Sequence, residues 1–263
     1  MSIVDDLRLD GKVALVTGAG RGIGERMAIS FAEVGADLAL VSRTASDLEK
    51  VAAQVKAVGR KALIITADVS DLNVIPGVID QVVNGLGGLD ILANVAGVTL
   101  RKPVLDAKVA DWDRVMNTNL RGVYFMTQAA GRVMAAQRHG KIINITSMAA
   151  IRGFEQLSIY GMTKAAVGLL TQVLGVEWAQ YNIQVNAIAP GWVATSMTAS
   201  RTNTPEWRLR WVQEQVPQGH FGQPKDIAGI AVYLASAASD FCTGQVFAVD
   251  GGFSAGSPDP RNL

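Results

Sequence analysis

Short apolar runs alternate with longer segments of helical periodicity almost from the first residue, and this alternation limits the fold more than any other feature. Runs of about four to eight apolar residues are typical of buried strands, and apolar residues repeating every three or four positions are typical of helices. Strands are expected at Val13–Thr17, Asp37–Ser42, Ala62–Thr66, Leu89–Asn94, Gly140–Thr146, Gln184–Ala189 and Gln245–Val249. Helices are expected at Gly22–Val34, Asp47–Val58, Leu72–Leu86, Ala110–Ala136, Ser158–Ala179 and Pro224–Ala235.

Strand–helix alternation predicts right-handed crossovers and a parallel sheet with helices on both faces. We therefore expect an α/β fold of the Rossmann type, a doubly wound parallel sheet of about seven strands. The 263 residues suit one domain, residues 1–263, because no Pro/Gly-rich linker or internal repeat divides them. Ser46 and Glu49 form a candidate capping box for the second helix.

Composition argues against several classes of function. The net charge of +1, with charges spread along the chain, does not fit a nucleic-acid binder. The start is too acidic for a secretory signal, and no stretch is expected to be long enough to span a membrane. The single cysteine, Cys242, fits a reducing cytoplasm, and His139 and His220 are too far apart in sequence to suggest a metal site.

An apolar strand, a glycine-rich turn and the start of a helix follow one another in VALVTGAGRGIGERMA. Glycines let backbone amides approach phosphate oxygens, and the helix N-terminus favours negative charge. The spacing is T-G-x-x-x-G-x-G rather than G-x-G-x-x-G, and a tight strand–helix connection is the simpler alternative. The candidate cofactor-binding residues here are Gly18, Gly20, Arg21, Gly22, Ile23 and Gly24.

The end of the second strand distinguishes NADP from NAD. An NAD site usually has Asp or Glu there to bind the ribose 2′-hydroxyl, whereas an NADP site prefers arginine. Here the strand ends in VSRT, with Ser42 and Arg43 in place of an acid, and Arg21 lies in the glycine turn. A guanidinium grips phosphate in a planar fork. The sequence therefore favours NADP, with NAD as the alternative.

A proton-transfer pair is predicted at Tyr160 and Lys164. Their spacing places the two side chains one above the other on a helix face, and the segment around them has helical periodicity and no proline. A nearby ammonium favours the phenolate and would lower the tyrosine pKa from its usual value of about 10. Ser147 lies 13 residues upstream. A surface tyrosine beside a lysine stem is the alternative interpretation.

Together these residues resemble the short-chain dehydrogenase/reductase family, from about Leu9 to Gly252. The motifs occur in the family's order: Thr17 to Gly24, Asp68-Val69, Asn94 to Gly97, Asn119, Ser147, Tyr160 with Lys164, and Pro190-Gly191 followed by Thr195. Any single motif could be accidental, whereas the ordered set is specific. The family commonly has two asparagines before Ala-Gly, but here Asn94 is followed by Val95, which we expect to change strand packing rather than chemistry.

The resemblance implies a role for each residue. Tyr160 would donate a proton to a carbonyl oxygen in reduction and accept it in oxidation, while Ser147 would hydrogen-bond that oxygen. Lys164 would lower the tyrosine pKa and hold the nicotinamide ribose. Asn119, within a helix, would position a water that links Lys164 to solvent. The implied cofactor contacts are Asp68 and Val69 at the adenine, Asn94, Ala96 and Gly97 along the cofactor, and Pro190, Gly191, Val193 and Thr195 at the carboxamide end.

The resemblance implies an oxidoreductase that interconverts a carbonyl and a secondary alcohol. EWAQYNIQVNAIAPGWVAT and the later FCTGQVFAVDGG are similar to both gluconate 5-dehydrogenase-like and 3-oxoacyl-thioester reductase members. We expect a small polar keto or hydroxy compound such as a sugar acid, with 3-oxoacyl-thioester or general ketone reduction as the alternative. A non-catalytic NADP-binding regulatory protein is an alternative of a different class, which the complete catalytic set argues against.

Two segments, Trp192–Gln223 and Ser254–Leu263, interrupt the strand–helix alternation. The first is rich in apolar bulk and is expected to be a mobile lid over the substrate, with Met148–Ser158 as a second specificity segment. The arginines of Trp192–Gln223 are Arg201, Arg208 and Arg210, which either bind a substrate anion or form a solvated helix face. The segment Ser254–Leu263 is expected to be an exposed tail. Family relatives usually assemble as tetramers, and Ala165, Leu169 and Val173 would suit such helix packing.

Overall fold

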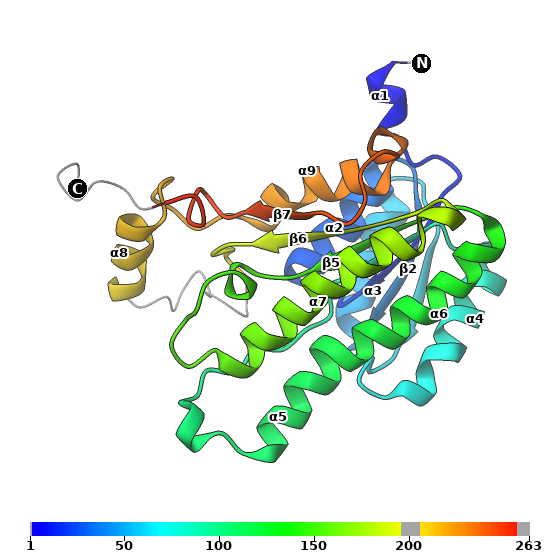
Figure 1. The fold of residues 1–263 in the computed structure, drawn as a ribbon. Coiled ribbons are helices and arrows are strands. Elements are labelled where there is room, and N and C mark those ends of the chain that lie inside the picture. The colour runs from blue at the N-terminus through cyan, green and yellow to red at the C-terminus, as the bar shows by residue number, and fades with distance from the viewer. Residues whose placement is uncertain (1, 196–205, 257–263) are drawn as a thin grey trace.

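One parallel sheet organises the molecule. The structure is a computed structural model that describes residues 2–195 and 206–256. Its strands are β1 (Val13–Thr17), β2 (Asp37–Ser42), β3 (Ala62–Thr66), β4 (Ile91–Asn94), β5 (Gly140–Ile145), β6 (Ile183–Pro190) and β7 (Val246–Val249). Within the described residues they form one sheet in the order β3-β2-β1-β4-β5-β6-β7, and all neighbouring strands are parallel (Figure 1). The predicted doubly wound α/β fold is confirmed.

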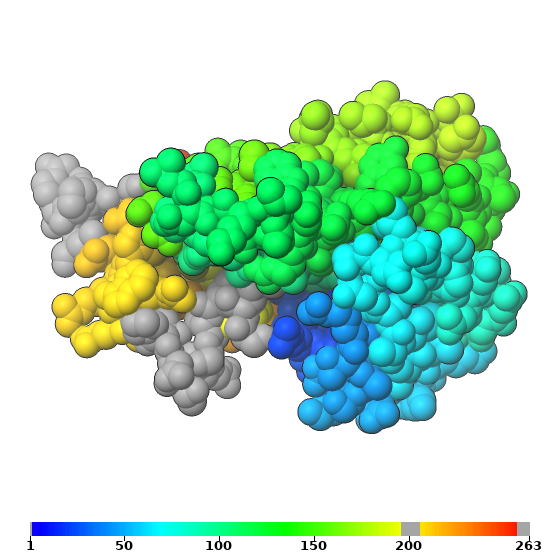
Figure 2. Space-filling view, turned by 90° about the horizontal axis from the view of Figure 1, so that it is seen from below, coloured from blue at the N-terminus to red at the C-terminus, as the bar shows by residue number. Residues whose placement is uncertain are grey.

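Helices cover both faces of the sheet. They are α1 (Ile3–Asp6), α2 (Gly22–Glu33), α3 (Ala45–Ala57), α4 (Ile75–Leu86), α5 (Val109–Met116), α6 (Gly122–Gln137), α7 (Ser158–Glu177), α8 (Glu206–Gln215) and α9 (Pro224–Ala235). One hydrophobic cluster contains side chains of α2, α3 and α9, and the other contains side chains of α4, α6 and α7. In Figure 2 the green surface of residues 100–135 runs beside cyan α4, and yellow α8 lies at the opposite end from α4.

Strand β1 shows why its sequence is apolar at every position. Ala14 and Val16 belong to the first hydrophobic cluster, whereas Val13 and Leu15 belong to the second. Successive side chains of a strand point to opposite faces, and both faces are covered here. All five residues of β1 are therefore buried.

Two expectations about helix boundaries need correction. The predicted capping box of Ser46 and Glu49 is wrong, because α3 begins at Ala45 with Thr44 at its N-cap. In the segment between β2 and α3, the Thr44 amide donates to the hydroxyl of Ser42 at 3.3 Å. The helix expected over Ala110–Ala136 is two helices, α5 and α6, joined by a π-helical turn at Asn117–Arg121.

Helix α7 has 20 residues and by length and composition alone could cross a membrane, contrary to the sequence expectation. The core helix of a globular domain passes the same test. Ile159, Val167 and Leu174 of α7 are buried, and α7 packs against β6. We therefore interpret α7 as a core helix.

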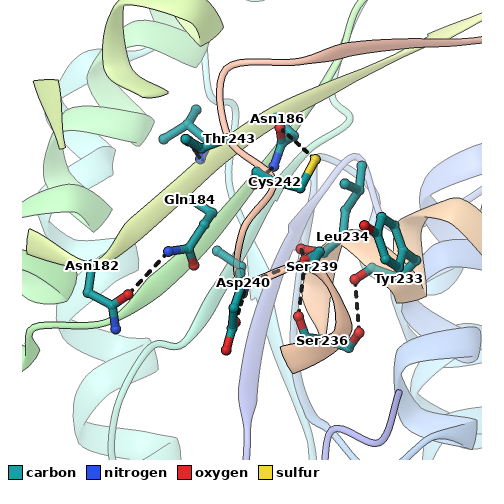
Figure 3. Close-up of polar contacts among 12 residues, drawn as sticks. Asn182, Gln184, Asn186, Tyr233, Leu234, Ser236, Ser239, Asp240, Cys242 and Thr243 are labelled. Atoms are coloured by element: carbon teal, nitrogen blue, oxygen red, sulfur yellow. Dashed lines mark hydrogen bonds and ion pairs between the residues drawn. The ribbon is translucent and has the colours of Figure 1, made fainter. Parts of the chain in front are cut away.

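A polar network ties β5 and β6 to the segment before β7, at the end of the sheet opposite the carboxyl ends of the strands. The Asn186 amide donates to the Cys242 carbonyl at 2.7 Å, and the Cys242 thiol donates to Asn186 Oδ1 at 3.7 Å (Figure 3). Lys141, nearly buried on β5, donates to Ser239 at 3.3 Å and to Asp240 at 2.7 Å. Burial lowers the pKa of Lys141, partly offset by Asp240. These contacts pair a buried ammonium that would otherwise be costly.

Candidate active site

A cavity of about 600 Å³ opens along the carboxyl ends of the strands. Strand order reverses between β1 and β4, the position where open α/β sheets bind ligands. Of the predicted cofactor-binding residues, the cavity is lined by Gly18, Gly20, Arg21, Gly22, Ile23, Gly24, Ser42, Arg43, Asp68, Val69, Ala96, Gly97, Tyr160, Lys164, Pro190, Gly191, Val193 and Thr195. The sequence motifs, spread over most of the chain, thus meet at one site.

The glycine turn leads from β1 into α2 at the cavity wall. Gly18 has φ +69°, and a Cβ there would lie 2.8 Å from the backbone nitrogen of Ala96, so a side chain cannot be accommodated. The hydroxyl of Thr17 accepts from the amides of Val95 at 3.1 Å and Ala96 at 3.3 Å. The turn therefore sits flush against the loop after β4, and the N-terminus of α2 (Arg21 at its N-cap) faces the cavity.

The end of β2 carries the residues expected to select the cofactor. Arg43 is exposed, and its guanidinium lies 3.7 Å from the carboxylate of Asp68. Asp68 accepts from the amide of Ser70 at 2.9 Å and from its hydroxyl at 2.7 Å. Burial raises the pKa of Asp68, but the hydrogen bonds from Ser70 and the charge of Arg43 outweigh burial and hold that pKa below its usual value. Asp68 is thus an ionised acceptor at neutral pH.

The predicted catalytic residues come from β5 and α7. Ser147 follows β5, and its hydroxyl accepts from the Ala149 amide at 3.1 Å. Tyr160 lies in the first turn of α7, and its hydroxyl is close enough to Ser147 for that residue to affect its pKa. Lys164, one turn later, is buried and donates to the Ile145 carbonyl at 2.7 Å. Two hydroxyls and one ammonium therefore meet beside the glycine turn.

The electrostatics differ from the expectation that Lys164 lowers the pKa of Tyr160. Burial raises the pKa of Tyr160, and the hydrogen bond with Ser147 only partly offsets the effect. Burial also lowers the pKa of Lys164 to about 8. The ammonium is bonded to the carbonyl of Ile145 and lies 5.8 Å from the centroid of the tyrosine ring. Desolvation therefore dominates, and it favours a neutral phenol, which is the form that donates a proton.

Asn119 lies in the π-helical turn between α5 and α6, and it is fully buried behind the cavity rather than in its wall. Its amide donates to the Val98 carbonyl at 2.8 Å, and its oxygen accepts from the Val98 amide at 2.8 Å. The amide also approaches the hydroxyl of Thr163 on α7 at 3.3 Å. A Cβ on Gly97 would lie 3.3 Å from Asn119 Oδ1 and 3.7 Å from Lys164 Nζ. Asn119 thus holds the loop after β4 against the lysine.

Asn94, also predicted to lie along the cofactor, is not among the residues that line the cavity. Its amide donates to the hydroxyl of Thr127 at 2.8 Å and to Asn144 Oδ1 at 2.9 Å, so it is buried between β4, β5 and α6. Asn144 donates in turn to Thr171 of α7 at 3.0 Å. Because all these groups are buried, the amide must be satisfied within the protein, and its role is to join the sheet to the helices.

The segment predicted as a lid places α8 beyond the carboxyl ends of β6 and β7 (Figure 1). Its aromatic residues pack with those of the segment before α7: the ring centroids of Trp192 and Trp211 are 5.2 Å apart, and those of Phe154 and Trp192 are 6.2 Å apart. Arg201 lies outside the described residues, as do residues 257–263 of the predicted tail, whereas residues 254–256 are exposed.

The comparisons with known proteins agree with this geometry. A family model described as enoyl-(acyl carrier protein) reductase matches residues 18–254. The 2-dehydro-3-deoxy-D-gluconate 5-dehydrogenase of Dickeya dadantii is 41% identical over 254 residues, 96% of this chain and 99% of that protein. The chain belongs to the short-chain dehydrogenase/reductase family. It is therefore an oxidoreductase.

Other family members cover the chain equally well. The 3-oxoacyl-[acyl-carrier-protein] reductase of Thermotoga maritima is 36% identical over 94% of this chain and 99% of its own length. The crystal structure of a gluconate 5-dehydrogenase from Burkholderia cenocepacia J2315 in complex with NADP and tartrate has a TM-score of 0.92 at 37% identity, covering 97% of this chain and 99% of that chain.

In this short-chain dehydrogenase/reductase, the sequence motifs did not reveal several cavity residues. Arg101, Asp47 and Arg114 line the cavity although no motif contains them. Asp47 lies beside the glycine turn, because a Cβ added to Gly20 would be 3.0 Å from the Cβ of Asp47. Arg101 follows the Asn94–Gly97 motif by a few residues, so its place in the loop at a carboxyl strand end was the signal available in the sequence.

Proposed function

We propose that this enzyme is an NADP-dependent oxidoreductase that interconverts a keto group and a secondary alcohol on a small sugar acid. The observation that carries the proposal is the shared cavity: the Tyr160–Ser147 hydroxyl pair and the glycine turn line the same space. A proton donor and a dinucleotide cradle in one cavity are the two requirements of carbonyl reduction by hydride transfer.

The residues present fit a dinucleotide. The turn at Gly18 lacks room for a side chain, and the N-terminus of α2 faces the cavity, so a pyrophosphate could approach the backbone amides there. Arg21, Ser42 and Arg43 would hold the 2′-phosphate, and Asp68 would accept from the adenine amino group. When bound, the nicotinamide supplies or accepts the hydride.

Tyr160 would donate its hydroxyl proton to the substrate carbonyl oxygen during reduction and accept it during oxidation. The pKa raised by burial keeps the phenol protonated and ready to donate. Ser147 would donate a hydrogen bond to the same oxygen as negative charge develops on it. Lys164, buried next to this pair, would supply positive charge and bind ribose hydroxyls. Asn119 would keep the loop after β4 in place.

The relatives support NADP as the cofactor and a sugar acid as the substrate. Several relatives are named sugar-acid dehydrogenases, and solved relatives hold NADP. The relative from Burkholderia cenocepacia was solved with tartrate, a small hydroxy acid. Reduction of a 3-oxoacyl thioester is the second candidate, because the relative from Thermotoga maritima is named for it.

A panel of substrates tests the proposed function. NADPH oxidation, followed by absorbance, is measured with keto sugar acids, neutral keto sugars, simple ketones and acetoacetyl thioesters, and NADP⁺ reduction is measured with D-gluconate. We expect the highest kcat/KM with a sugar acid. Turnover confined to acyl thioesters or hydrophobic ketones would reject the substrate, and no turnover with any of them would reject the enzyme reaction itself.

Arg43→Asp is expected to lower kcat/KM with NADPH about 10- to 100-fold while kcat/KM with NADH changes little. The substitution removes a charge-assisted hydrogen bond to phosphate and adds a repelling carboxylate. Initial rates with both cofactors measure the effect. Arg26→Ala is the control for loss of an arginine outside the predicted cofactor contacts, because Arg26 of α2 pairs with Glu33 at 2.7 Å. An equal fall with both cofactors would contradict a phosphate contact.

We propose a homotetramer in the cytoplasm, as the sequence suggested. Leu169, Val173 and Val176 of α7 are exposed, as are Tyr124 and Phe125 of α6. Exposed apolar side chains on neighbouring helices support association between copies of the chain.

A further inference from the structure

Two arginines from distant parts of the chain line the cavity. Arg101 lies in the loop between β4 and α5, and Arg208 lies on α8. In Figure 2 the yellow surface of α8 lies at the same end of the molecule as the green surface around residues 100–110. Trp192, which follows β6, also lines the cavity, and the Arg101 guanidinium lies 5.8 Å from the centroid of its ring.

The charges of these two arginines act on each other. Burial lowers the pKa of Arg101, and the positive charge of Arg208 lowers it further. Two guanidinium groups close enough to interact, one of them partly withdrawn from water, raise the electrostatic free energy of the protein. An anion bound by both guanidinium groups would lower this electrostatic free energy.

The acids of the cavity lie elsewhere. Among the described residues, those lining it are Asp47 and Asp68. Asp47 approaches Gly20 and the end of β2, and Asp68 follows β3. In the sheet order, β2 and β3 lie on one side of β1, whereas the segments after β5 and β6 that carry Ser147 and Trp192 lie on the other. Within residues 2–195 and 206–256, the substrate side of the cavity therefore has positive side chains without a carboxylate in its wall.

The two arginines of α8 have different surroundings, so only one of them belongs to a solvated helix face. Arg210 is exposed and pairs with Glu206 at 2.7 Å in an i,i+4 arrangement, so it has the solvated role that the sequence left open. Arg208, two residues earlier, lines the cavity, and its guanidinium lies 5.3 Å from the centroid of the Trp207 ring.

We infer that Arg101 and Arg208 bind the carboxylate of the substrate at the end of the cavity away from the adenosine site, an inference that rests on the proposed function. Guanidinium groups match carboxylates in planar geometry. The Trp192 ring would hold the Arg101 guanidinium in position through its π face. Because one arginine is on the β4–α5 loop and the other is on α8, a carboxylate bound by both would draw α8 over the substrate. The enzyme would then select acids over neutral polyols.

The test compares an acid with a neutral analogue of the same length. Oxidation of D-gluconate and of D-glucitol by NADP⁺ is measured for the wild type and for Arg101→Met, Arg208→Met and Arg210→Met. We expect each of the first two substitutions to raise KM for D-gluconate about 10- to 100-fold, with kcat changed much less and with D-glucitol unaffected. The Arg210→Met variant should match the wild type.

Two results would overturn the inference. One is an equal effect of Arg101→Met on acid and polyol, which indicates a structural role. The other is an effect of Arg210→Met as large as that of Arg208→Met, which indicates that the overall positive charge of α8, rather than a contact with the carboxylate, changes KM. Inhibition by acetate and by inorganic phosphate distinguishes the anions: stronger inhibition by phosphate, lost in the variants, would replace the carboxylate with a phosphoryl group.

A binding measurement separates this inference from the proposed reaction. Calorimetric titration of L-tartrate into the complete enzyme with NADP⁺ needs no turnover. Weaker binding to Arg101→Met and Arg208→Met, with wild-type binding to Arg210→Met, would support the carboxylate site even if the substrate panel found no reaction. Tartrate binding unchanged in all three variants would reject the site even if the enzyme oxidised sugar acids.

Discussion

Tyr160→Phe is expected to reduce kcat/KM at least about 10³-fold while leaving the fold intact. The substitution removes the hydroxyl that would transfer the proton, and general acid–base catalysis of this kind contributes about 10²- to 10⁴-fold. The ring stays in place, so packing in the first turn of α7 should be kept. Ser147 would still polarise the carbonyl oxygen, which accounts for a small residual rate.

The measurement is steady-state kinetics with the best substrate of the panel, together with the Kd for NADPH from fluorescence titration. We expect the Kd to change little, because the hydroxyl acts on the substrate rather than on the phosphates. Tyr124→Phe, an exposed tyrosine on α6, is the control. If Tyr160→Phe kept full activity, the proton would have to come from another group, and the proposed mechanism would be wrong.

Lys164→Met is expected to abolish most activity and, unusually for a buried position, to cost little or no stability at pH 7. Burial lowers the pKa of Lys164 from 10.5 to about 8, so keeping it charged in the folded state costs about 3 kcal/mol at pH 7. Methionine removes that cost. It also leaves the Ile145 carbonyl without its partner, which costs about 1–3 kcal/mol. The two effects nearly cancel.

The stability difference between the wild type and Lys164→Met should depend on pH in one direction. Below pH 8 the lysine is protonated in both the folded and the unfolded state, so the difference is constant. Between about pH 8 and 10.5 the folded state loses the proton while the unfolded state keeps it. The unfolding free energy of the wild type then gains up to about 1.4 kcal/mol per pH unit relative to the variant.

Urea denaturation of both proteins at pH 7, 8, 9 and 10 measures this difference. Lys225→Met, an exposed lysine on α9, is the control for the change of charge and should show no such trend. A difference between the wild type and Lys164→Met that stays constant from pH 7 to pH 10 would show that the lysine keeps its proton throughout, and the pKa of about 8 would be wrong.

The sequence was sufficient for the fold and for the convergence of most motifs on one cavity, because both depend on local patterns. β1 is apolar at each position since both faces of the sheet are covered, and Gly18 is needed where the turn meets Ala96. Most of the predicted motifs lie at or just after the carboxyl end of a strand, and the described strands are parallel, so these motifs converge at one edge of the sheet.

What the sequence missed depends on surroundings that no local pattern reports. The motif could not show that the side-chain amide of Asn94 bonds to Thr127 and Asn144 rather than lining the cavity. The pKa of Tyr160 rises instead of falling because burial outweighs a lysine bonded elsewhere. Arg101 has no motif, and its place beside Trp192 arises only when the loop after β4 meets the segment after β6.

The π-helical turn at Asn117–Arg121 constrains the number of residues in this segment as well as their identity. A single deletion that restored regular winding would rotate every earlier side chain by about 100° relative to α6. Asn119 would then turn from the loop it holds. Shifting α6 instead would replace Gly122, whose position leaves no room for a Cβ against the Val69 carbonyl. Homologues that diverge freely in identity should therefore keep this segment free of gaps.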